Sequence, residues 1–366
     1  MPGERAVRRV LMTADAVGGV WTYAMDLAGG LRRHDVQVTL AVMGPPMSDG
    51  HRADAERRGI EVVEAPYRLE WMEDPWADVE EAGPWLMGLA DRTGADVVHL
   101  NGFCHASLPW KVPAIVVAHS CVRSWWRGVH GEPAPDAWDG YSARVAEGLR
   151  HAGIVVAPTH ALLREVQAEY GVSVPCAVIP NGTSAVDQHQ SGPKEPLVFS
   201  AGRLWDEAKN FETLSAAAPH VSWPVYLAGD SEGPGGRFVP SGSVRCLGRL
   251  DPAAMGAWYA RAAIYALPAR YEPFGLSIVE AAAAGCALVL GDIRTLRENW
   301  SGAAVFVPPD NRRALAAAIE GLIADPVRRL ELGSRARQRA SEFTVTRMCG
   351  RYQDLYGAVM APAAAA

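Results

Sequence analysis

A regular alternation of short β-branched runs with longer stretches of helical periodicity is the feature that most constrains the fold of this chain. Between the runs, apolar residues recur at four-residue spacing, as in Tyr23, Leu27 and Leu31, which predicts helices with one buried face. Strands and helices that alternate in this way form a mostly parallel sheet covered by helices on both faces. The first half contains seven predicted strands: Val7–Met12, Val36–Val42, Ile60–Glu64, Val97–Leu100, Ala114–Ala118, Ile154–Ala157 and Ala177–Ile179.

The second half repeats this pattern, and a chain of 366 residues is too long for one ordinary hydrophobic core. Its predicted strands are Leu197–Ser200, Val225–Ala228, Val244–Leu247, Ile264–Leu267 and Ala287–Leu290. The segment Val186–Pro196 is polar and contains Gly and Pro, which is typical of a linker. We therefore predict an α/β protein with two Rossmann-like domains, residues 1–190 and 191–345. A final helix, residues 346–366, is expected to pack back on the first domain.

Composition excludes several classes of protein. The net charge is −6, from 35 basic and 41 acidic residues, which gives no support to nucleic acid as a partner. No apolar run approaches the ~20 residues of a membrane span. The six cysteines are scattered, without metal-ligand or redox-pair spacing, which favours buried thiols in a reducing compartment. We predict a cytoplasmic protein without a membrane span, and the oligomeric state stays open.

The segment Tyr271–Glu280, YEPFGLSIVE, joins a predicted strand to an alanine-rich helix, Leu276–Ala284. Free backbone N–H groups at the start of a helix bind anions. Glu272 precedes the helix, whereas Glu280 lies within it, and a carboxylate in a mostly apolar helix needs a partner such as a pair of sugar hydroxyls. An ordinary strand–turn–helix with surface glutamates is the alternative, and this motif alone favours neither.

Two basic residues follow the first strand of the second half. Arg203 stands in GRL directly after the strand, and Lys209 precedes Asn210 just before the next helix. Arginine binds phosphate bidentately and lysine acts as a mobile point charge, so the pair suits a diphosphate. Any single basic residue, however, is more commonly an exposed surface group.

The carboxyl ends of three strands in the first half carry further candidates. Gly18 and Gly19 follow the first strand and open a helix, where glycines let the backbone approach phosphate. The pattern is not G-x-G-x-x-G, so a nicotinamide site is weakly supported, and a tight turn is an equal alternative. His119 ends a later strand, and His99 and Asn101 end another. Ligands bind outside the carboxyl ends of parallel strands, although a lone histidine is more often structural.

Tryptophan is abundant, with 12 residues in the chain. Four of them cluster in predicted loops of the first domain: Trp71, Trp76, Trp125 and Trp126. Aromatic faces stack on sugar rings, but for any one of these side chains an anchor of a small loop core is the favoured alternative.

Taken together, YEPFGLSIVE, GRL with the downstream KN, the early Gly-Gly, a strand-end His and IPNG at Ile179–Gly182 resemble glycosyltransferase family 4. The likeness covers nearly the whole chain in the same order. It implies the GT-B fold, in which two Rossmann-like domains face each other across a cleft. It also implies that the donor is a nucleotide sugar and that no cofactor is needed. The chain contains no D-x-D, so we expect no metal site either.

The resemblance implies a role for each matching residue. Arg203 and Lys209 would contact the diphosphate, Glu272 the transferred sugar and Glu280 the ribose. Phe274, Gly275 and Leu276 would offer backbone N–H groups. Gly18 and Gly19 would lie near the diphosphate and the transferred sugar. His119 would lie beside the reacting face of the sugar. We predict catalytic roles for His119, Glu272, Arg203 and Lys209. The acceptor is assigned to Asn101, Trp125 and Trp126.

These residues predict a retaining glycosyltransferase that moves a hexose-type sugar to an acceptor hydroxyl without a metal. A UDP-sugar is the favoured donor, followed by GDP-mannose. Three competing hypotheses stay open. A nucleotide-sugar 2-epimerase shares the fold but needs acid–base residues for proton removal. A non-catalytic nucleotide-sugar-binding protein is the second, and an NAD-dependent dehydrogenase, which would need a glycine fingerprint that the chain lacks, is the third.

Overall fold

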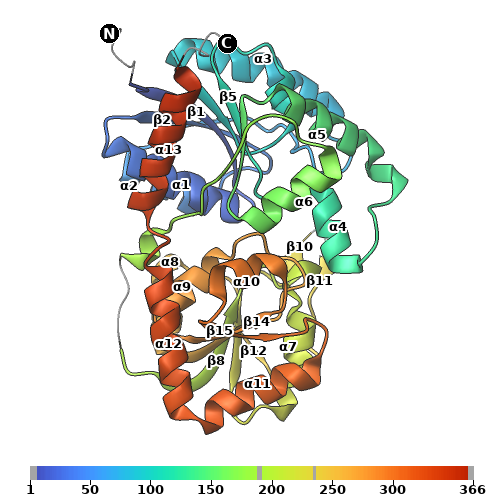
Figure 1. Ribbon diagram of the computed structural model, residues 1–366, viewed down its shortest axis with the longest axis vertical. Coiled ribbons are helices and arrows are strands. Elements are labelled where there is room, and N and C mark those ends of the chain that lie inside the picture. Colours follow the sequence, from blue (N-terminus) through green and yellow to red (C-terminus); the bar gives the residue numbers. More distant parts are fainter. Residues whose placement is uncertain (1–5, 188–191, 234–235, 362–366) are drawn as a thin grey trace. The chain divides into compact units, whose positions relative to one another are not determined.

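The structure is a computed structural model that describes residues 6–187, 192–233 and 236–361. Contacts divide the chain into two compact units, which we name unit 1 and unit 2 (Figure 1). Unit 1 comprises the described residues within Met1–Ser124, Pro133–Gly182 and Val345–Ala366. Unit 2 comprises those within Trp125–Glu132 and Thr183–Thr344. The two predicted Rossmann-like α/β domains are confirmed, because each unit is built on a parallel sheet.

Unit 1 contains a sheet of seven parallel strands in the order β3-β2-β1-β4-β5-β6-β7. The strands are β1 (Arg9–Asp15), β2 (Gln37–Met43), β3 (Glu61–Glu64), β4 (Val97–Leu100), β5 (Ala114–Val117), β6 (Ile154–Ala157) and β7 (Cys176–Val178). Central strands such as β4 and β5 are buried along their whole length. A strand covered on both faces needs apolar side chains on both, which explains the continuous Val and Ile runs of the sequence.

The helices of unit 1 bury the faces that the sequence periodicity predicted. Tyr23, Leu27 and Leu31 of α1 have no exposed surface and share one core cluster with Met348 and Tyr352 of α13. The helices are α1 (Gly19–Arg32), α2 (Asp49–Arg58), α3 (Trp76–Thr93), α5 (Asp139–His151), α6 (His160–Tyr170) and α13 (Val345–Met360), with short 3-10 turns η1 (Cys104–Ser107) and η2 (Asp136–Trp138). Helix α4 (Val122–His130) begins in unit 1, and its later residues group with unit 2.

Unit 2 contains a sheet of six parallel strands in the order β12-β9-β8-β13-β14-β15, and a separate hairpin, β10-β11. The strands are β8 (Glu195–Ala201), β9 (Val225–Ala228), β10 (Glu232–Gly233), β11 (Gly236–Arg237), β12 (Arg245–Cys246), β13 (Ala262–Leu267), β14 (Ala287–Gly291) and β15 (Ala304–Val307). The helices are α7 (Phe211–Ala217), α8 (Pro252–Arg261), α9 (Leu276–Ala283), α10 (Arg294–Trp300), α11 (Arg312–Ala324) and α12 (Pro326–Ala340), with 3-10 turns η3 (Ser184–Val186), η4 (Glu207–Lys209) and η5 (Ala218–His220).

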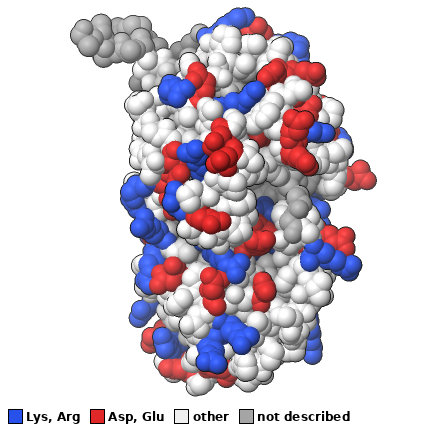
Figure 2. Space-filling model, turned by 90° about the vertical axis from the view of Figure 1, so that its right-hand side faces the viewer, with Lys and Arg blue, Asp and Glu red and all other residues white. Residues whose placement is uncertain are grey.

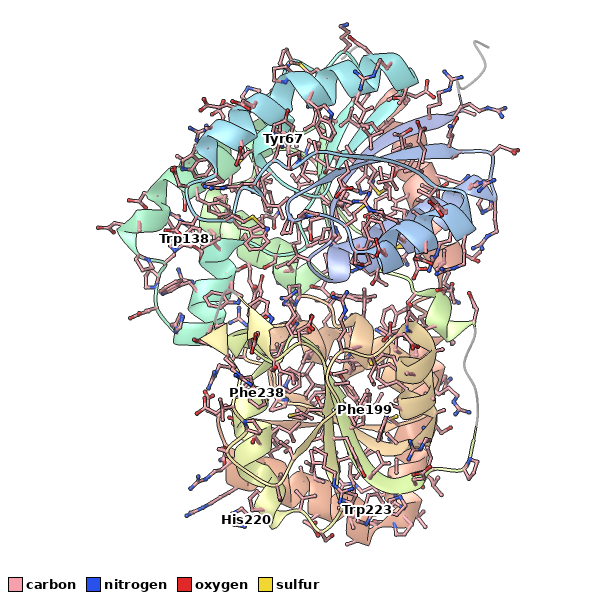
Figure 3. The ribbon with its side chains drawn as sticks, turned by 180° about the vertical axis from the view of Figure 1, so that it is seen from behind. Tyr67, Trp138, Phe199, His220, Trp223 and Phe238 are labelled. Atoms are coloured by element: carbon pink, nitrogen blue, oxygen red, sulfur yellow. The ribbon has the colours of Figure 1, made fainter. Side chains whose placement is uncertain are left out.

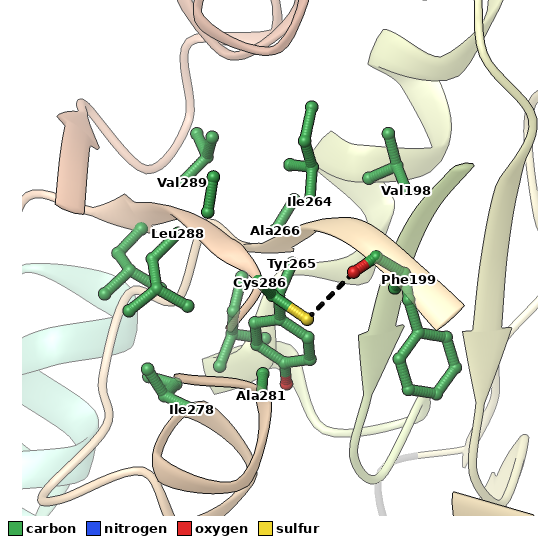
Figure 4. Packing of buried hydrophobic residues seen from close by; sticks show 14 of the residues in the cluster. Val198, Phe199, Ile264, Tyr265, Ala266, Ile278, Ala281, Cys286, Leu288 and Val289 are labelled. Atoms are coloured by element: carbon green, nitrogen blue, oxygen red, sulfur yellow. Dashed lines mark hydrogen bonds between the residues drawn. The ribbon is translucent and has the colours of Figure 1, made fainter. Parts of the chain in front are cut away.

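The core of unit 2 lies between its sheet and its helices. Side chains of β8, β13 and β14 pack with Ile278 and Ala281 of α9 (Figure 4). Phe199 of β8 lies inside the unit and stacks on Trp258, with ring centroids 5.7 Å apart (Figure 3). Because α9 is held by this core, the loop that leads into it has a fixed position within unit 2.

Unit 2 begins earlier in the chain than the predicted boundary at residue 190. The Thr183 N–H donates to the Phe343 carbonyl over 3.0 Å, and Val186 is buried in the unit 2 core. Part of the predicted linker is therefore packed structure, and its residues 188–191 lie outside the described ranges. Contacts group α13 with unit 1, where Met348 Sδ accepts from the Gly182 N–H over 3.2 Å.

Two further predictions need correction. The segment Trp125–Glu132, placed in the first domain by sequence, groups with unit 2 because Gly128 packs against the Tyr271 ring. Of the six cysteines, four are buried as expected, but Cys176 is only partly buried and Cys246 is exposed. Cys246 lies on β12, an exposed edge strand of the sheet that pairs with β9.

Charged side chains of both signs are interspersed on the face of the molecule shown in Figure 2. No helix in the described ranges is both long and apolar enough to span a membrane. Within the same part of the chain, no group of three or more His, Cys, Asp or Glu side chains is placed to hold a metal ion.

Candidate functional site

Both sheets reverse their strand order at one point. In unit 1 the chain runs outward from β1 through β2 and β3, and then returns to place β4 on the other side of β1. In unit 2 the same reversal occurs between β8 and β13. The helices that leave such a pair go to opposite faces, so a crevice forms outside the carboxyl ends of the two strands, where ligands bind. These two edges contain most of the predicted site residues.

The loop after β1 leads directly into α1. The Val17 N–H donates to Asp15 Oδ1 over 2.9 Å, which fixes the turn, and Gly18 is the N-cap residue of α1. Gly18 has no side chain to cap the helix, and Gly19 is exposed. The first backbone N–H groups of α1 therefore receive no side-chain cap from Gly18 and suit an anionic or strongly polar ligand.

The ends of β4 and β5 bring Asn101 and His119 together. Asn101 Oδ1 lies 2.8 Å from His119 Nε2, and Asn101 Nδ2 donates to the Thr13 carbonyl over 2.7 Å. The ring of Tyr23 packs edge-on against the His119 ring, with centroids 4.5 Å apart. Burial lowers the pKa of His119 to about 4, so its imidazole is neutral near pH 7.

His99 has a structural role, as expected for a lone histidine in a strand. Its Nδ1 lies 2.7 Å from the Tyr356 hydroxyl, and its Nε2 lies 3.2 Å from the Tyr23 hydroxyl, which donates to Tyr352 over 2.7 Å. Burial, together with the charge that His119 can carry, lowers the pKa of His99 to about 3. These hydrogen bonds between uncharged side chains join α1, β4 and α13 within unit 1.

In unit 2, the loop after β8 holds Arg203 against a buried carboxylate. Arg203 Nη2 donates to Asp206 Oδ2 over 2.6 Å, and the guanidinium lies over the Trp205 ring, 5.5 Å from its centroid. Asp206 also caps η4 by accepting from the Ala208 N–H over 3.0 Å. Burial opposes the charge on Asp206, but Lys209 and Arg203 keep its pKa below the ordinary value. Nε of Arg203 is buried and has no hydrogen-bond partner among the described residues.

Lys209 and Glu272 form a mostly buried ion pair. Lys209 Nζ lies 2.6 Å from Glu272 Oε2, and the side chains expose 16% and 9% of their surface. The Thr295 hydroxyl donates to the Glu272 carbonyl over 2.6 Å and fixes the backbone before α9. Two residues that the sequence analysis assigned to different parts of one ligand are thus direct neighbours.

The start of α9 has the geometry of an anion site. Its N-cap residue, Gly275, has φ +89°, and a Cβ there would approach Ile278 Cδ1 to 2.7 Å, so glycine is required. The turn is supported by Tyr265, whose hydroxyl donates to Ser277 Oγ over 2.9 Å. Phe274 is buried, Leu276 is partly exposed, and Glu280 lies farther along α9, close enough to the buried Tyr259 to raise the pKa of that phenol further.

Two family models match this chain: Glycosyltransferase Family 4 over residues 17–185, and Glycosyl transferases group 1 over residues 195–325. The chain belongs to glycosyltransferase family 4. The matches together include all the predicted catalytic and donor-binding residues, from Gly18 to Glu280.

Curated relatives of this family 4 glycosyltransferase differ in how much of the chain they cover. Alpha-maltose-1-phosphate synthase from Mycolicibacterium smegmatis is 24% identical over 95% of this chain and 97% of the relative. Glycogen synthase from Mycobacterium tuberculosis is 38% identical, but over only 26% of this chain and 24% of the relative. The chain thus matches about a quarter of the length of that glycogen synthase.

Solved structures share the architecture of this family 4 glycosyltransferase at low sequence identity. Sucrose-phosphate synthase from Thermosynechococcus elongatus superposes with a TM-score of 0.80 at 18% identity, over 95% of this chain and 98% of that one. Anabaena HepE in complex with UDP-glucose has a TM-score of 0.73 at 17% identity, over 95% and 98%. The predicted GT-B fold is therefore confirmed.

The sequence analysis missed three glycines and one carboxylate in unit 2. Gly202, Gly229 and Gly248 follow β8, β9 and β12, and the Gly229 N–H donates to the Gly248 carbonyl over 2.9 Å. A Cβ on Gly229 would lie 1.7 Å from the Gly202 carbonyl oxygen, so the end of β9 tolerates no side chain at this position. The sequence did contain a signal for these positions, because a glycine follows several of the predicted strands. Asp206, which holds Arg203, gave no such signal.

Proposed function

We propose that this family 4 glycosyltransferase is a retaining hexosyltransferase that takes a sugar from a nucleotide diphosphate and needs no metal. A UDP-sugar is the favoured donor and GDP-mannose the second. Support for the first choice comes from Anabaena HepE, a structural neighbour that was solved with UDP-glucose. The acceptor is a hydroxyl compound.

The observation that carries this proposal is the Lys209–Glu272 pair beside the start of α9. A cation, a helix N-terminus and a carboxylate at one sheet edge suit a ligand that has an anionic part and a hydroxyl-bearing part. Arg203 and Lys209 would neutralise the diphosphate, whose charge grows as it leaves. Glu272 would accept hydrogen bonds from sugar hydroxyls, and Glu280 from the ribose.

Positive charge from these groups would do the work that a metal ion does in other transferases. Arg203 suits this role because Asp206 fixes one side of its guanidinium, while its buried Nε has no partner among the described residues. A preorganised donor costs little reorganisation during the reaction. We therefore expect activity to persist in a chelator.

For the reaction itself we propose a same-face substitution. The bond between the anomeric carbon and the phosphate oxygen breaks, and the acceptor oxygen bonds to that carbon on the face that the phosphate leaves. The acceptor proton passes to the departing phosphate oxygen, so the balance needs no protein base. Glu272 is already engaged by Lys209, which makes it a poor nucleophile for a covalent intermediate.

Unit 1 would supply contacts to uncharged groups, through the Gly18–Gly19 turn and the neutral ring of His119. From unit 2, Trp125 and Trp126 pack edge-on against each other, with centroids 5.8 Å apart, and remain candidates for stacking on the acceptor. Asn101 stays a candidate for an acceptor contact, because its amide uses one N–H on the Thr13 carbonyl and one lone pair on His119 and keeps a second of each.

The test combines donor screening with product analysis. UDP-, GDP-, ADP- and dTDP-sugars are screened by thermal shift, because a ligand at about 100 times its Kd stabilises the native state by about 2.7 kcal/mol. The stabilising donor is then incubated with enzyme and hydroxyl acceptors in EDTA, and NMR reads the anomeric configuration of the product. We expect retention without added metal. Inversion, a need for Mg²⁺ or Mn²⁺, or a glycosylated Glu272 peptide would contradict the proposal, and binding without turnover would identify a non-catalytic protein.

A further inference from the structure

We propose that Asn101 is a positioning residue that holds the His119 ring as the tautomer protonated at Nε2, so that Nδ1 accepts a hydrogen bond from a substrate hydroxyl. The tautomer follows from contacts within unit 1. The nature of the hydroxyl-bearing ligand, a sugar or its acceptor, rests on the proposed function.

The orientation of the Asn101 amide is fixed by its backbone neighbour. Asn101 Nδ2 lies 2.7 Å from the Thr13 carbonyl oxygen, which can only accept a hydrogen bond. The amide nitrogen must therefore face Thr13, and the amide oxygen must face His119. A second bond, from the Asn101 N–H to Thr13 Oγ1 over 2.8 Å, holds the end of β4 to β1 and restricts the side chain further.

This orientation determines the protonation of the His119 ring. Asn101 Oδ1 only accepts, and it lies 2.8 Å from His119 Nε2, so Nε2 must carry a hydrogen. Burial keeps the imidazole neutral near pH 7, and a neutral imidazole has only one N–H. His119 Nδ1 therefore has a free lone pair, and no described residue of unit 1 donates a hydrogen bond to it. The ring presents an acceptor rather than a donor to a ligand.

The ring is also held on its face. Tyr23 packs edge-on against it at 67° between ring planes, and the Tyr23 hydroxyl is tied to Tyr352 of α13 and to His99 of β4. Since Tyr23 donates to Tyr352, its lone pair accepts from the N–H at His99 Nε2. None of these three groups offers His119 a titrating charge near pH 7, because Tyr23 and Tyr352 have raised pKa values and His99 has a lowered one.

The consequence is a defined chemical selectivity. An acceptor at Nδ1 favours a ligand O–H and disfavours a phosphate oxygen, since two acceptors would face each other without a proton between them. A ligand that lacks the matching hydroxyl should be discriminated against, because a site built to bond a hydroxyl loses that bond when the group is absent.

The tautomer is read directly by NMR on the full-length protein with ¹⁵N-labelled histidine. The His119→Gln variant assigns the resonances. In the wild type we expect His119 protonated at Nε2 and unprotonated at Nδ1. In Asn101→Ala we expect a mixture of tautomers, with kcat for sugar transfer reduced at least tenfold while KM for the donor changes less than threefold.

Thr39→Val is the control, because Thr39 Oγ1 donates to Glu61 over 2.9 Å in the same sheet. This variant loses one side-chain hydrogen bond, whereas Asn101→Ala loses two. We expect Thr39→Val to keep the wild-type tautomer and kcat. A series of deoxy substrates adds a coupling test: one deoxy analogue should lose at least tenfold in kcat/KM with the wild type and clearly less with Asn101→Ala.

Several outcomes would overturn the proposal: a wild-type His119 protonated at Nδ1, an Asn101→Ala variant that keeps both the single tautomer and the wild-type kcat, or equal losses in the control. If no sugar is transferred by any variant, the proposed function fails. The NMR spectrum then still decides whether Asn101 fixes the ring, so the two failures are distinguishable.

Discussion

Unit 1 and unit 2 place their candidate residues at equivalent points, the carboxyl edge where the strand order reverses, but they fill those points with different chemistry. The ion pairs of unit 2 there include Arg203–Asp206 and Lys209–Glu272. Unit 1 has Asn101 and the neutral His119, backed by a chain of phenols and His99. The same architecture thus places charged side chains at the edge of one sheet and uncharged hydrogen-bonding groups at the edge of the other.

The largest effect is expected from removing one member of a buried ion pair. Lys209→Ala leaves the Glu272 carboxylate unpaired at 9% exposure, which costs about 3–5 kcal/mol of stability unless the carboxylate takes up a proton. Transfer should fall about 10²–10³-fold, because the leaving diphosphate loses a cation. Chemical denaturation and steady-state kinetics measure the two losses.

Arg261→Ala is the matched control in the same unit, since Arg261 Nε lies only 2.7 Å from Glu195 Oε1 but both side chains are exposed. Solvent screens an exposed pair, so this one contributes little to stability, and it lies away from the site. Equal losses of activity in Lys209→Ala and Arg261→Ala would remove the distinction between a site and an ordinary surface pair.

Acidification should lower the stability of unit 1 more than that of unit 2. The folded state keeps His99 neutral down to about pH 3, whereas the unfolded chain protonates it near pH 6.5, so stability is lost as the pH falls below 6.5. At pH 5 this amounts to about 2 kcal/mol, from roughly 1.5 pKa units at 1.36 kcal/mol each. The lowered pKa of Asp206 in unit 2 stabilises that unit above its unfolded value of 3.8, and this contribution is still present at pH 5.

Hydrogen exchange measured by mass spectrometry compares the backbone protection of the two units in one sample. The exchange rates at pH 7 and pH 5 are each corrected for the intrinsic rate. We expect β4 and α13 to lose protection at pH 5 and α9 to keep it. Uniform loss in both units, or none in either, would show that the neutral histidine network does not set the acid response of unit 1.

The smallest effect is expected in the uncharged network. Tyr352→Phe removes the hydroxyl that accepts from Tyr23 over 2.7 Å, and a neutral hydrogen bond contributes about 1 kcal/mol. Tyr23 keeps its bond to His99, so the loss should stay well below that of Lys209→Ala. Denaturant titration of both variants gives the two losses of unfolding free energy. A loss above about 3 kcal/mol in Tyr352→Phe would contradict the expectation that the uncharged network of unit 1 contributes less than the ion pair of unit 2.

Much of the fold could be predicted from local sequence, because long buried strands need continuous apolar runs. β4, β6 and β9 have the predicted bounds. The hairpin β10-β11 was missed, because two-residue strands have no periodicity to detect. β15 was missed although its sequence, AVFV, is β-prone.

The sequence indicated which residues belong to the site, but it did not indicate which side chains they contact. Lys209 and Glu272 are 63 residues apart in sequence, and only the adjacency of β8 and β13 brings them together. One partner of His99, the Tyr356 hydroxyl, comes from α13, more than 250 residues later in the chain. Local composition also could not show that Val186 is buried in unit 2, which is why the boundary was placed too late.

We propose that the unit 2 edge binds a nucleotide diphosphate through Arg203 and Lys209 without a metal. Isothermal titration of the full-length protein with UDP and GDP in EDTA tests it most directly, with Arg203→Ala beside the Arg261→Ala control. Loss of a charge-assisted bond of about 1.5–3 kcal/mol predicts roughly 10- to 150-fold weaker binding in Arg203→Ala and unchanged binding in the control. Equal affinity in wild type and Arg203→Ala, or binding only after Mg²⁺ or Mn²⁺ is added, would contradict the account.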